Sequence, residues 1–85
     1  MKKIWKYPVP IESEFEIEMP KHRKILAFAS QNQDPCLWVL VDPDSKKEKV
    51  GFHLYGTGQE LGYFGNYIGT AQVSGGALIW HPFED

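Results

Sequence analysis

The sequence alternates strictly between acidic and apolar residues over Glu14-Phe15-Glu16-Ile17-Glu18-Met19. In a β-strand, successive side chains point to opposite faces, so the apolar residues would share one face and the glutamates the other. A helical period would scatter the same apolar residues around the helix axis. The stretch therefore predicts a strand with one buried face and one acidic face in water.

Further segments show strand-like patterns separated by turn residues. They cover residues 5–9, 24–30, 36–41 and 50–55, and a final hairpin of residues 66–73 and 77–83 around Ser74-Gly75-Gly76. Alternation in the second segment places Leu26 and Phe28 on one face. Residues 36–41 are apolar throughout, which is typical of a central strand covered on both faces. We predict an all-β fold, a small antiparallel sandwich or barrel-like sheet of six to seven short strands, with residues 1–85 as a single β domain.

The composition limits the class of protein. The chain has 85 residues, a formal net charge of -2 and 14% aromatic residues. Nucleic-acid-binding domains usually carry a basic excess, so a nucleic-acid partner is not expected. Cys36 is the single cysteine, which favours a reducing cytoplasm over a disulfide-stapled secreted protein. No apolar run approaches the roughly 18 residues of a transmembrane helix, so no membrane association is expected.

No pattern of residues predicts a metal or catalytic site. The three histidines are His22, His53 and His81. They lack the i, i+2 or i, i+4 spacing of a ligand pair, and Cys36 lies in an apolar run where a thiol is buried and unreactive. The glutamates of residues 12–18 fit a solvated strand face better than a calcium site. We predict no metal, no cofactor and no enzymatic activity, and leave open whether His53 meets Thr57 or His81 meets Glu84.

The glycine-rich segment after residue 55 is the candidate binding site. Gly56-Thr57-Gly58-Gln59 could form a small anion-binding nest of backbone N–H groups if its glycines take positive φ. Thr57 and Gln59 would then supply hydrogen bonds to a phosphate or ribose. The alternative is a plain turn that leaves a strand.

Aromatic and histidine side chains complete the predicted site. Tyr63 and Tyr67 follow the glycines and could stack on a base or line a partner's groove, although they could also cap a thin core. The predicted ligand-binding residues are Gly56, Thr57, Gly58, Gln59, Tyr63, Tyr67, His53 and His81.

Several segments together resemble a known family. They are Ile4-Trp5-Lys6-Tyr7, Phe15-Glu16-Ile17-Glu18-Met19-Pro20, Leu40-Val41-Asp42-Pro43, Gly56-Thr57-Gly58, Tyr67-Ile68-Gly69-Thr70 and Gly76-Ala77-Leu78-Ile79-Trp80-His81. Their order is similar to that in a family of small proteins of this length found mostly in bacteriophages and prophages. That family often has a histidine after its Gly-Thr-Gly, where this chain has Gln59.

The resemblance implies a phage accessory protein, a class that often inhibits or sequesters components of host defence. Two functions follow as hypotheses. The protein would sequester a nucleotide-type small ligand in the host cytoplasm, or it would inhibit a host protein by direct protein–protein contact. The thin core expected of so short a chain, its many aromatics and its apolar C-terminal segment also predict a homo-oligomer, most simply a dimer.

Overall fold

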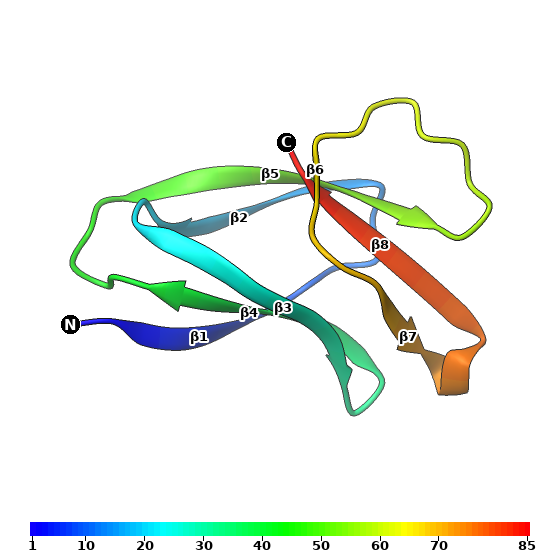
Figure 1. Ribbon diagram of the computed structural model, residues 1–85, viewed down its shortest axis with the longest axis horizontal. Coiled ribbons are helices and arrows are strands. Elements are labelled where there is room, and N and C mark those ends of the chain that lie inside the picture. The colour runs from blue at the N-terminus through cyan, green and yellow to red at the C-terminus, as the bar shows by residue number, and fades with distance from the viewer.

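Eight strands form two antiparallel sheets in the computed structural model of the chain (Figure 1). The structure describes residues 1–85 apart from the side chain of Ser74. The elements are β1 (Lys3–Pro8), β2 (Glu14–Pro20), β3 (Arg23–Gln31), β4 (Asp34–Val41), β5 (Lys47–Gly56), β6 (Asn66–Tyr67), β7 (Ala71–Val73), the short 3-10 helix η1 (Ser74–Gly76) and β8 (Leu78–Glu84). The predicted all-β antiparallel fold is confirmed. There are eight strands, not six or seven, because residues 68–70 split one expected strand into β6 and β7.

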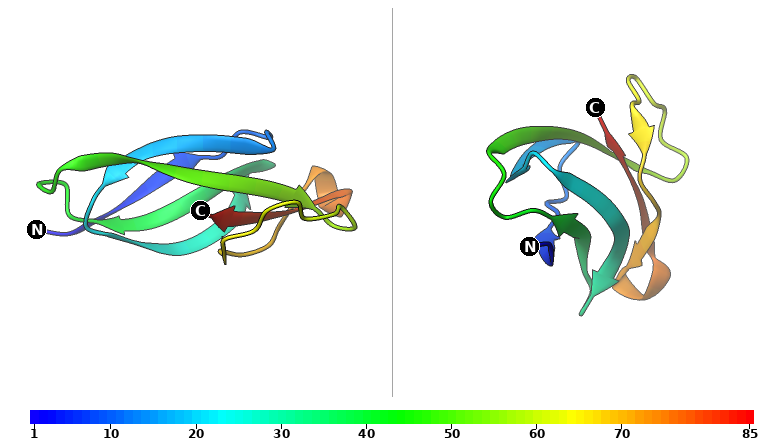
Figure 2. Two further views of the ribbon diagram at one scale, coloured as in Figure 1. Left: turned by 90° about the horizontal axis from the view of Figure 1, so that it is seen from above. Right: turned by 60° about the vertical axis from the view of Figure 1, so that its left-hand side comes forward.

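The strand order is β1-β4-β3 in a three-stranded sheet and β2-β5-β8-β6 in a five-stranded sheet, where β7 also pairs with β8. β5 connects the two parts of the five-stranded sheet, because its residues 47–53 pair with β2 and its residues 52–56 pair with β8. In the right-hand view of Figure 2, β3 and β4 lie on the concave side of the surface that β5 and β8 form.

The core lies between the two sheets and is built from alternate residues of the strands. Five of its side chains are at most 1% exposed, namely Met19, Leu37, Val39, Val41 and Phe52. The rings of Phe15 and Phe52 stack with their centroids 5.2 Å apart. Full burial of one such side chain contributes about 1.5–3 kcal/mol relative to exposure. The alternation of residues 14–19 therefore predicted the buried face of β2 correctly.

β4 is the central strand of the three-stranded sheet, as its apolar sequence predicted. Its inward face is fully covered, and Cys36 is buried as expected. Its outward face is covered only in part, since Trp38 and Leu40 are half-buried. The prediction that β4 is covered on both faces is therefore correct for the inward face and only partly correct for the outward face.

The predicted orientation of Leu26 is wrong because β3 contains a β-bulge. Ile25 pairs with Val39 but Ala27 pairs with Trp38, so Leu26 is an extra residue without a partner of its own in the register. Phe28 is 6% exposed and joins the core together with Ile25, whereas Leu26 is 46% exposed. Leu26 and Phe28 do not share a buried face, because the extra residue reverses the alternation at this point.

Arg23 links the two sheets electrostatically. It begins β3, and its guanidinium lies 3.6 Å from the carboxylate of Glu48 on β5 and 3.6 Å from that of Glu84 on β8. The same group donates a hydrogen bond to the carbonyl of Pro20 over 3.2 Å. Its side chain is 16% exposed, so these contacts satisfy a charge that is largely removed from water.

Leucine-to-alanine variants test the core and the bulge. Leu37→Ala should lower the free energy of unfolding by about 2–5 kcal/mol, because it leaves a cavity in a fully buried site. Leu26→Ala makes the same chemical change on the outer side and should cost less than about 1 kcal/mol. Urea unfolding of both variants measures the difference. Equal losses would show that Leu26 is buried and that the bulge is misplaced.

Candidate functional site

The pairing of β5 with β8 brings the predicted site residues together. Tyr55 lies opposite His81, and His53 lies opposite Phe83. Tyr67 of β6 also lies opposite Phe83. Residues directly opposite in an antiparallel pair point to the same face. These side chains therefore gather on the outer face of the five-stranded sheet, away from the core.

A concavity of about 240 Å³ lies at the Gly56 end of this face. It is lined by Tyr55, Gly56, Thr57, Gly58, Gln59, Leu61, Tyr67, His81 and Phe83, and is called the His81 concavity below. Six of the eight predicted ligand-binding residues line it. The other two, His53 and Tyr63, lie beside it in ring contact with each other, with centroids 4.9 Å apart.

A chain of hydrogen bonds holds the imidazole of His81. Its Nε2 lies 2.7 Å from Thr57 Oγ1, and its Nδ1 lies 2.9 Å from Thr70 Oγ1. Thr70 Oγ1 in turn lies 2.5 Å from the hydroxyl of Tyr67. Because both ring nitrogens are engaged, the plane of the imidazole is fixed. Of the pairings left open by the sequence, Thr57 thus meets His81 and not His53.

The turn after β5 uses most of its backbone N–H groups internally. Gly56 N–H donates to the side-chain carbonyl of Gln59 over 3.0 Å, and Gln59 N–H donates back to the Gly56 carbonyl over 3.1 Å. Thr57 N–H donates to the carbonyl of Ile79. Positive φ occurs at Gly58, with φ 87°, but not at Gly56, because Gly56 is still a strand residue paired with Trp80. The expected geometry of an anion-binding nest is therefore not formed.

Tyr55 holds the segment that follows this turn against β5 by hydrogen bonds to its backbone. The Tyr55 hydroxyl accepts a hydrogen bond from the backbone N–H of Tyr63 over 3.3 Å and donates to the backbone carbonyl of the same residue. Tyr55 is buried as a result. Phe83 lies edge-on to the rings of Tyr55, Phe64 and Tyr67.

Several side chains on the covering segment remain in water. Leu61, Tyr63, Phe64 and Tyr67 are 42%, 50%, 64% and 60% exposed, and are called the loop patch below. Monomeric proteins seldom leave a contiguous group of large apolar side chains exposed without a functional reason. The loop patch borders the His81 concavity, since Leu61 and Tyr67 belong to both.

Sequence reasoning missed four residues of this region, namely Tyr55, Leu61, Thr70 and Phe83. Tyr55 and Phe83 could have been found, because each stands two residues from a predicted histidine and alternation gives it the same face. Thr70 carried no such signal, since residues 68–70 lie between two strands.

His53 belongs to a separate ionic cluster on the same face. Its Nδ1 lies 2.6 Å from Asp85 Oδ1, and its Nε2 lies 3.3 Å from Glu14 Oε1. The hydrogen bond to Asp85 raises the pKa of His53, partial burial opposes the change, and the charges of Asp85 and Glu14 add to it. His53 therefore joins β5 to β2 and to the end of β8. The other open pairing, His81 with Glu84, is not formed, because Glu84 binds Arg23.

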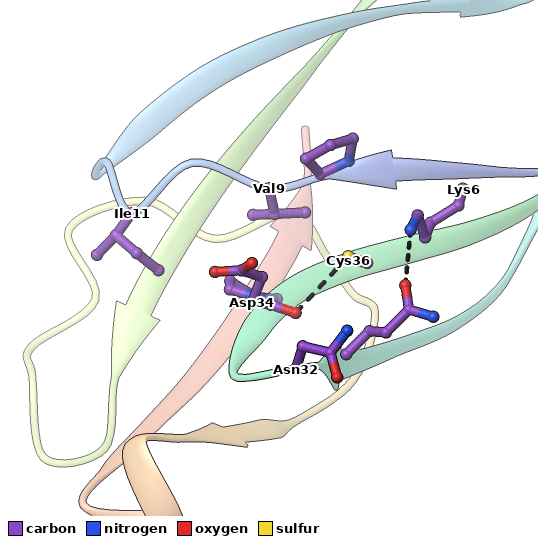
Figure 3. A pocket seen from close by; sticks show the side chains of 9 residues that line it. Lys6, Val9, Ile11, Asn32, Asp34 and Cys36 are labelled. Carbon is purple, nitrogen blue, oxygen red and sulfur yellow. Dashed lines mark hydrogen bonds between the residues drawn. The ribbon is translucent and has the colours of Figure 1, made fainter.

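A second concavity lies where β1 leads into the chain before β2. Figure 3 shows Lys6, Asn32, Asp34 and Cys36 around it. Lys6 Nζ donates to the side-chain carbonyl of Gln31 over 2.6 Å, and the thiol of Cys36 lies 3.6 Å from the backbone carbonyl of Asp34. No pattern in the sequence predicted this concavity. In the part of the chain that the structure describes, no three His, Cys, Asp or Glu side chains are grouped to hold a metal ion.

A protein-family model matches residues 1–85, the whole chain. The chain belongs to the family described as Domain of unknown function (DUF7352). No curated protein and no solved structure matches it. Within the described residues, no helix of this DUF7352 chain is long and apolar enough to span a membrane.

The His81 concavity unites segments of the DUF7352 chain that are far apart in sequence. Thr57 comes from Gly56-Thr57-Gly58, Tyr67 and Thr70 come from Tyr67-Ile68-Gly69-Thr70, and His81 ends Gly76-Ala77-Leu78-Ile79-Trp80-His81. Three of the segments that distinguish this sequence thus meet through side-chain hydrogen bonds. This convergence makes the concavity the strongest candidate site.

The pH dependence of stability tests the His53 cluster. A histidine with a raised folded-state pKa stabilises the fold fully below its unfolded pKa of about 6.5 and loses this contribution as pH rises through the folded value. His53→Gln should therefore destabilise the protein most near about pH 6, and the loss should shrink toward about pH 9. Urea unfolding at both values measures it.

Asp85→Asn removes the main cause of the raised pKa. In that background, His53→Gln should show a weaker pH dependence. A loss from His53→Gln that is equal at both pH values in the wild-type background would rule out an ionic role for this histidine.

Proposed function

We propose that the protein is a small phage or prophage accessory protein that binds and sequesters a nucleotide-type ligand without catalysis, as a counter to host defence in the host cytoplasm. The observation that carries the proposal is the convergence of Thr57, Tyr67 and His81 on one concavity. The resemblance of the sequence to phage and prophage proteins supports the biological setting.

Preorganisation supports a binding role. The hydroxyls of Thr57 and Thr70 orient the imidazole of His81 before any ligand arrives. The carbonyl oxygen of Gln59 is held by Gly56 N–H, so its amide nitrogen is the group that could donate to a ligand. Side chains that are already ordered lose less conformational entropy on binding, which raises affinity.

Aromatic walls support a ligand that contains a ring. Three aromatic residues line the concavity, namely Tyr55, Tyr67 and Phe83. The edge-on contacts of Tyr55 and Tyr67 with Phe83 hold its ring in place. Stacking of one base on an aromatic side chain contributes about 1–3 kcal/mol. A heterocycle with donors and acceptors on its edge could use this stacking together with the hydroxyl of Thr57 and the amide nitrogen of Gln59.

Calorimetric titration tests the proposal. Wild-type protein is titrated with cyclic nucleotides and ADP-ribose derivatives, together with the Thr57→Val variant. Valine keeps the volume of threonine nearly constant and removes one hydroxyl, so affinity should fall about tenfold, or about 1.4 kcal/mol. Near-ultraviolet circular dichroism checks that the variant is folded.

Phe64→Ala is the matched control, because Phe64 belongs to the loop patch but does not line the concavity. Its affinity for the ligand should equal that of the wild type. An unchanged affinity of Thr57→Val would remove this hydroxyl from the site, and no binding of any of these ligands to wild-type protein would refute the proposal.

The exposed loop patch favours a second candidate function, inhibition of a host protein by direct contact. Aromatic side chains are enriched at the centres of protein interfaces. In this case Phe64→Ala should abolish the complex that native mass spectrometry detects in protein purified from phage-infected cells. A second copy of the chain is another partner that would cover the patch, and sedimentation velocity at high micromolar concentration would then show a dimer that Phe64→Ala weakens.

A further inference from the structure

We infer that the His81 concavity recognises the uncharged ring of its ligand and leaves any phosphate outside, so that it is a nucleoside site. This inference rests on the proposed function and specifies which part of a nucleotide-type ligand enters. Three observations point to it: the charge around the concavity, the state of its backbone donors and its size.

The charge around the concavity disfavours phosphate. Among the residues that the structure describes, no lysine or arginine lines it. Glu60 stands between two lining residues, Gln59 and Leu61. Lys49 is the nearest lysine along β5, seven residues before Gly56, or about 23 Å along an extended strand. A phosphate at this end of the sheet would find no lysine or arginine among the lining residues, and Glu60 adds a negative charge to the same segment.

The carboxylates near His53 add to the negative charge near the concavity. Glu14 and Asp85 bind the imidazole of His53, which contacts the ring of Tyr63 next to the concavity. Acidic residues thus occur in two segments next to the aromatic walls, Glu60 in the loop after Gly58 and Glu14 and Asp85 in the His53 cluster. The two carboxylates of the His53 cluster exceed the single positive charge that His53 can carry, so the cluster disfavours anions and tolerates a neutral ring.

Most of the backbone donors that bind phosphate elsewhere are occupied here, three of the four N–H groups of residues 56–59. Phosphate loops present several consecutive N–H groups to the anion. In this turn, Gly56 N–H, Thr57 N–H and Gln59 N–H each donate to an acceptor of the protein itself. Recognition must then come mainly from side chains. Both nitrogens of His81 are engaged, so the groups with hydrogen-bonding capacity left are the hydroxyl of Thr57 and the amide nitrogen of Gln59, which match the edge of a heterocycle.

The volume of the concavity suits one ring system and not a whole nucleotide. Its volume of about 240 Å³ lies below the range of about 300–1,000 Å³ that holds whole drug-sized ligands. A base would lie against the rings of Tyr67 and Phe83, which contact each other, and its sugar would lie at the mouth beside Gly58. Apart from Gly58 and its two neighbours in the chain, no residue has an atom within 4 Å of the position that a Cβ on Gly58 would take, so the backbone there is open to a sugar.

Paired titrations test the inference. Adenosine, guanosine, cytidine and uridine are compared with their 5′-monophosphates by NMR, with the signals of His81 and Tyr67 as reporters. At least one nucleoside should bind at least as tightly as its monophosphate. Added salt should strengthen the binding of the monophosphate, because it screens repulsion, and should leave the nucleoside unchanged.

A variant that removes the charge of Glu60 tests whether this residue repels the phosphate. Glu60→Gln should raise affinity for the monophosphate about two- to threefold at low salt and leave the nucleoside unaffected, as expected for one exposed charge. Glu18→Gln is the matched control, since Glu18 pairs with Lys49 in the sheet register, far from the concavity, and it should change neither affinity.

The outcomes separate this inference from the proposed function. If every monophosphate binds more tightly than its nucleoside, or if salt weakens the binding of the monophosphates, the nucleoside site is refuted while sequestration of a nucleotide stands. If neither class of ligand binds, both the inference and the proposed function are wrong. Nucleoside binding that Thr57→Val does not weaken would place the ring elsewhere on the protein and also overturn the inference.

Discussion

Burial of one face of β5 decides what its other face can present. Phe52 and its neighbours two residues away pack into the core, which directs His53 and Tyr55 outward. A shift of the strand by one residue would bury these polar side chains and expose the core residues, so the register is strongly specified. β8 pairs with β5 in this register and thereby places His81 opposite Tyr55. The position of the candidate site thus follows from the packing of the core.

The fold could be predicted from the sequence where alternation alone determines which side chains point into the core. β2 and β5 are strands with a strict period of two, and their buried and exposed residues followed from it. The same period accounts for the placing of Thr57, Tyr67 and His81 near one another, since each lies on or beside strands of the five-stranded sheet. Glycines and aromatics at strand ends therefore indicated the correct region of the molecule.

Tertiary packing decided the rest. The bulge at Leu26 adds one residue to β3, and nothing in a run of apolar residues shows where such an insertion falls. The break between β6 and β7 brings Thr70 to His81 through a hydrogen bond that no local pattern encodes. The turn after β5 differed from expectation because the long side chain of Gln59 reached back to Gly56 N–H. Such side-chain-to-backbone bonds compete with the open loop that glycines alone would favour.

Gln59 is the residue on which the character of the site depends. An amide side chain follows Gly-Thr-Gly in this chain. The amide carbonyl closes the turn on Gly56 N–H and leaves an amide nitrogen for other contacts. A turn that uses three of its four backbone N–H groups internally has little left to offer an anion, and recognition then depends on side chains. Together with the aromatic rings of Tyr67 and Phe83, this makes the surface suited to planar, uncharged groups with polar edges.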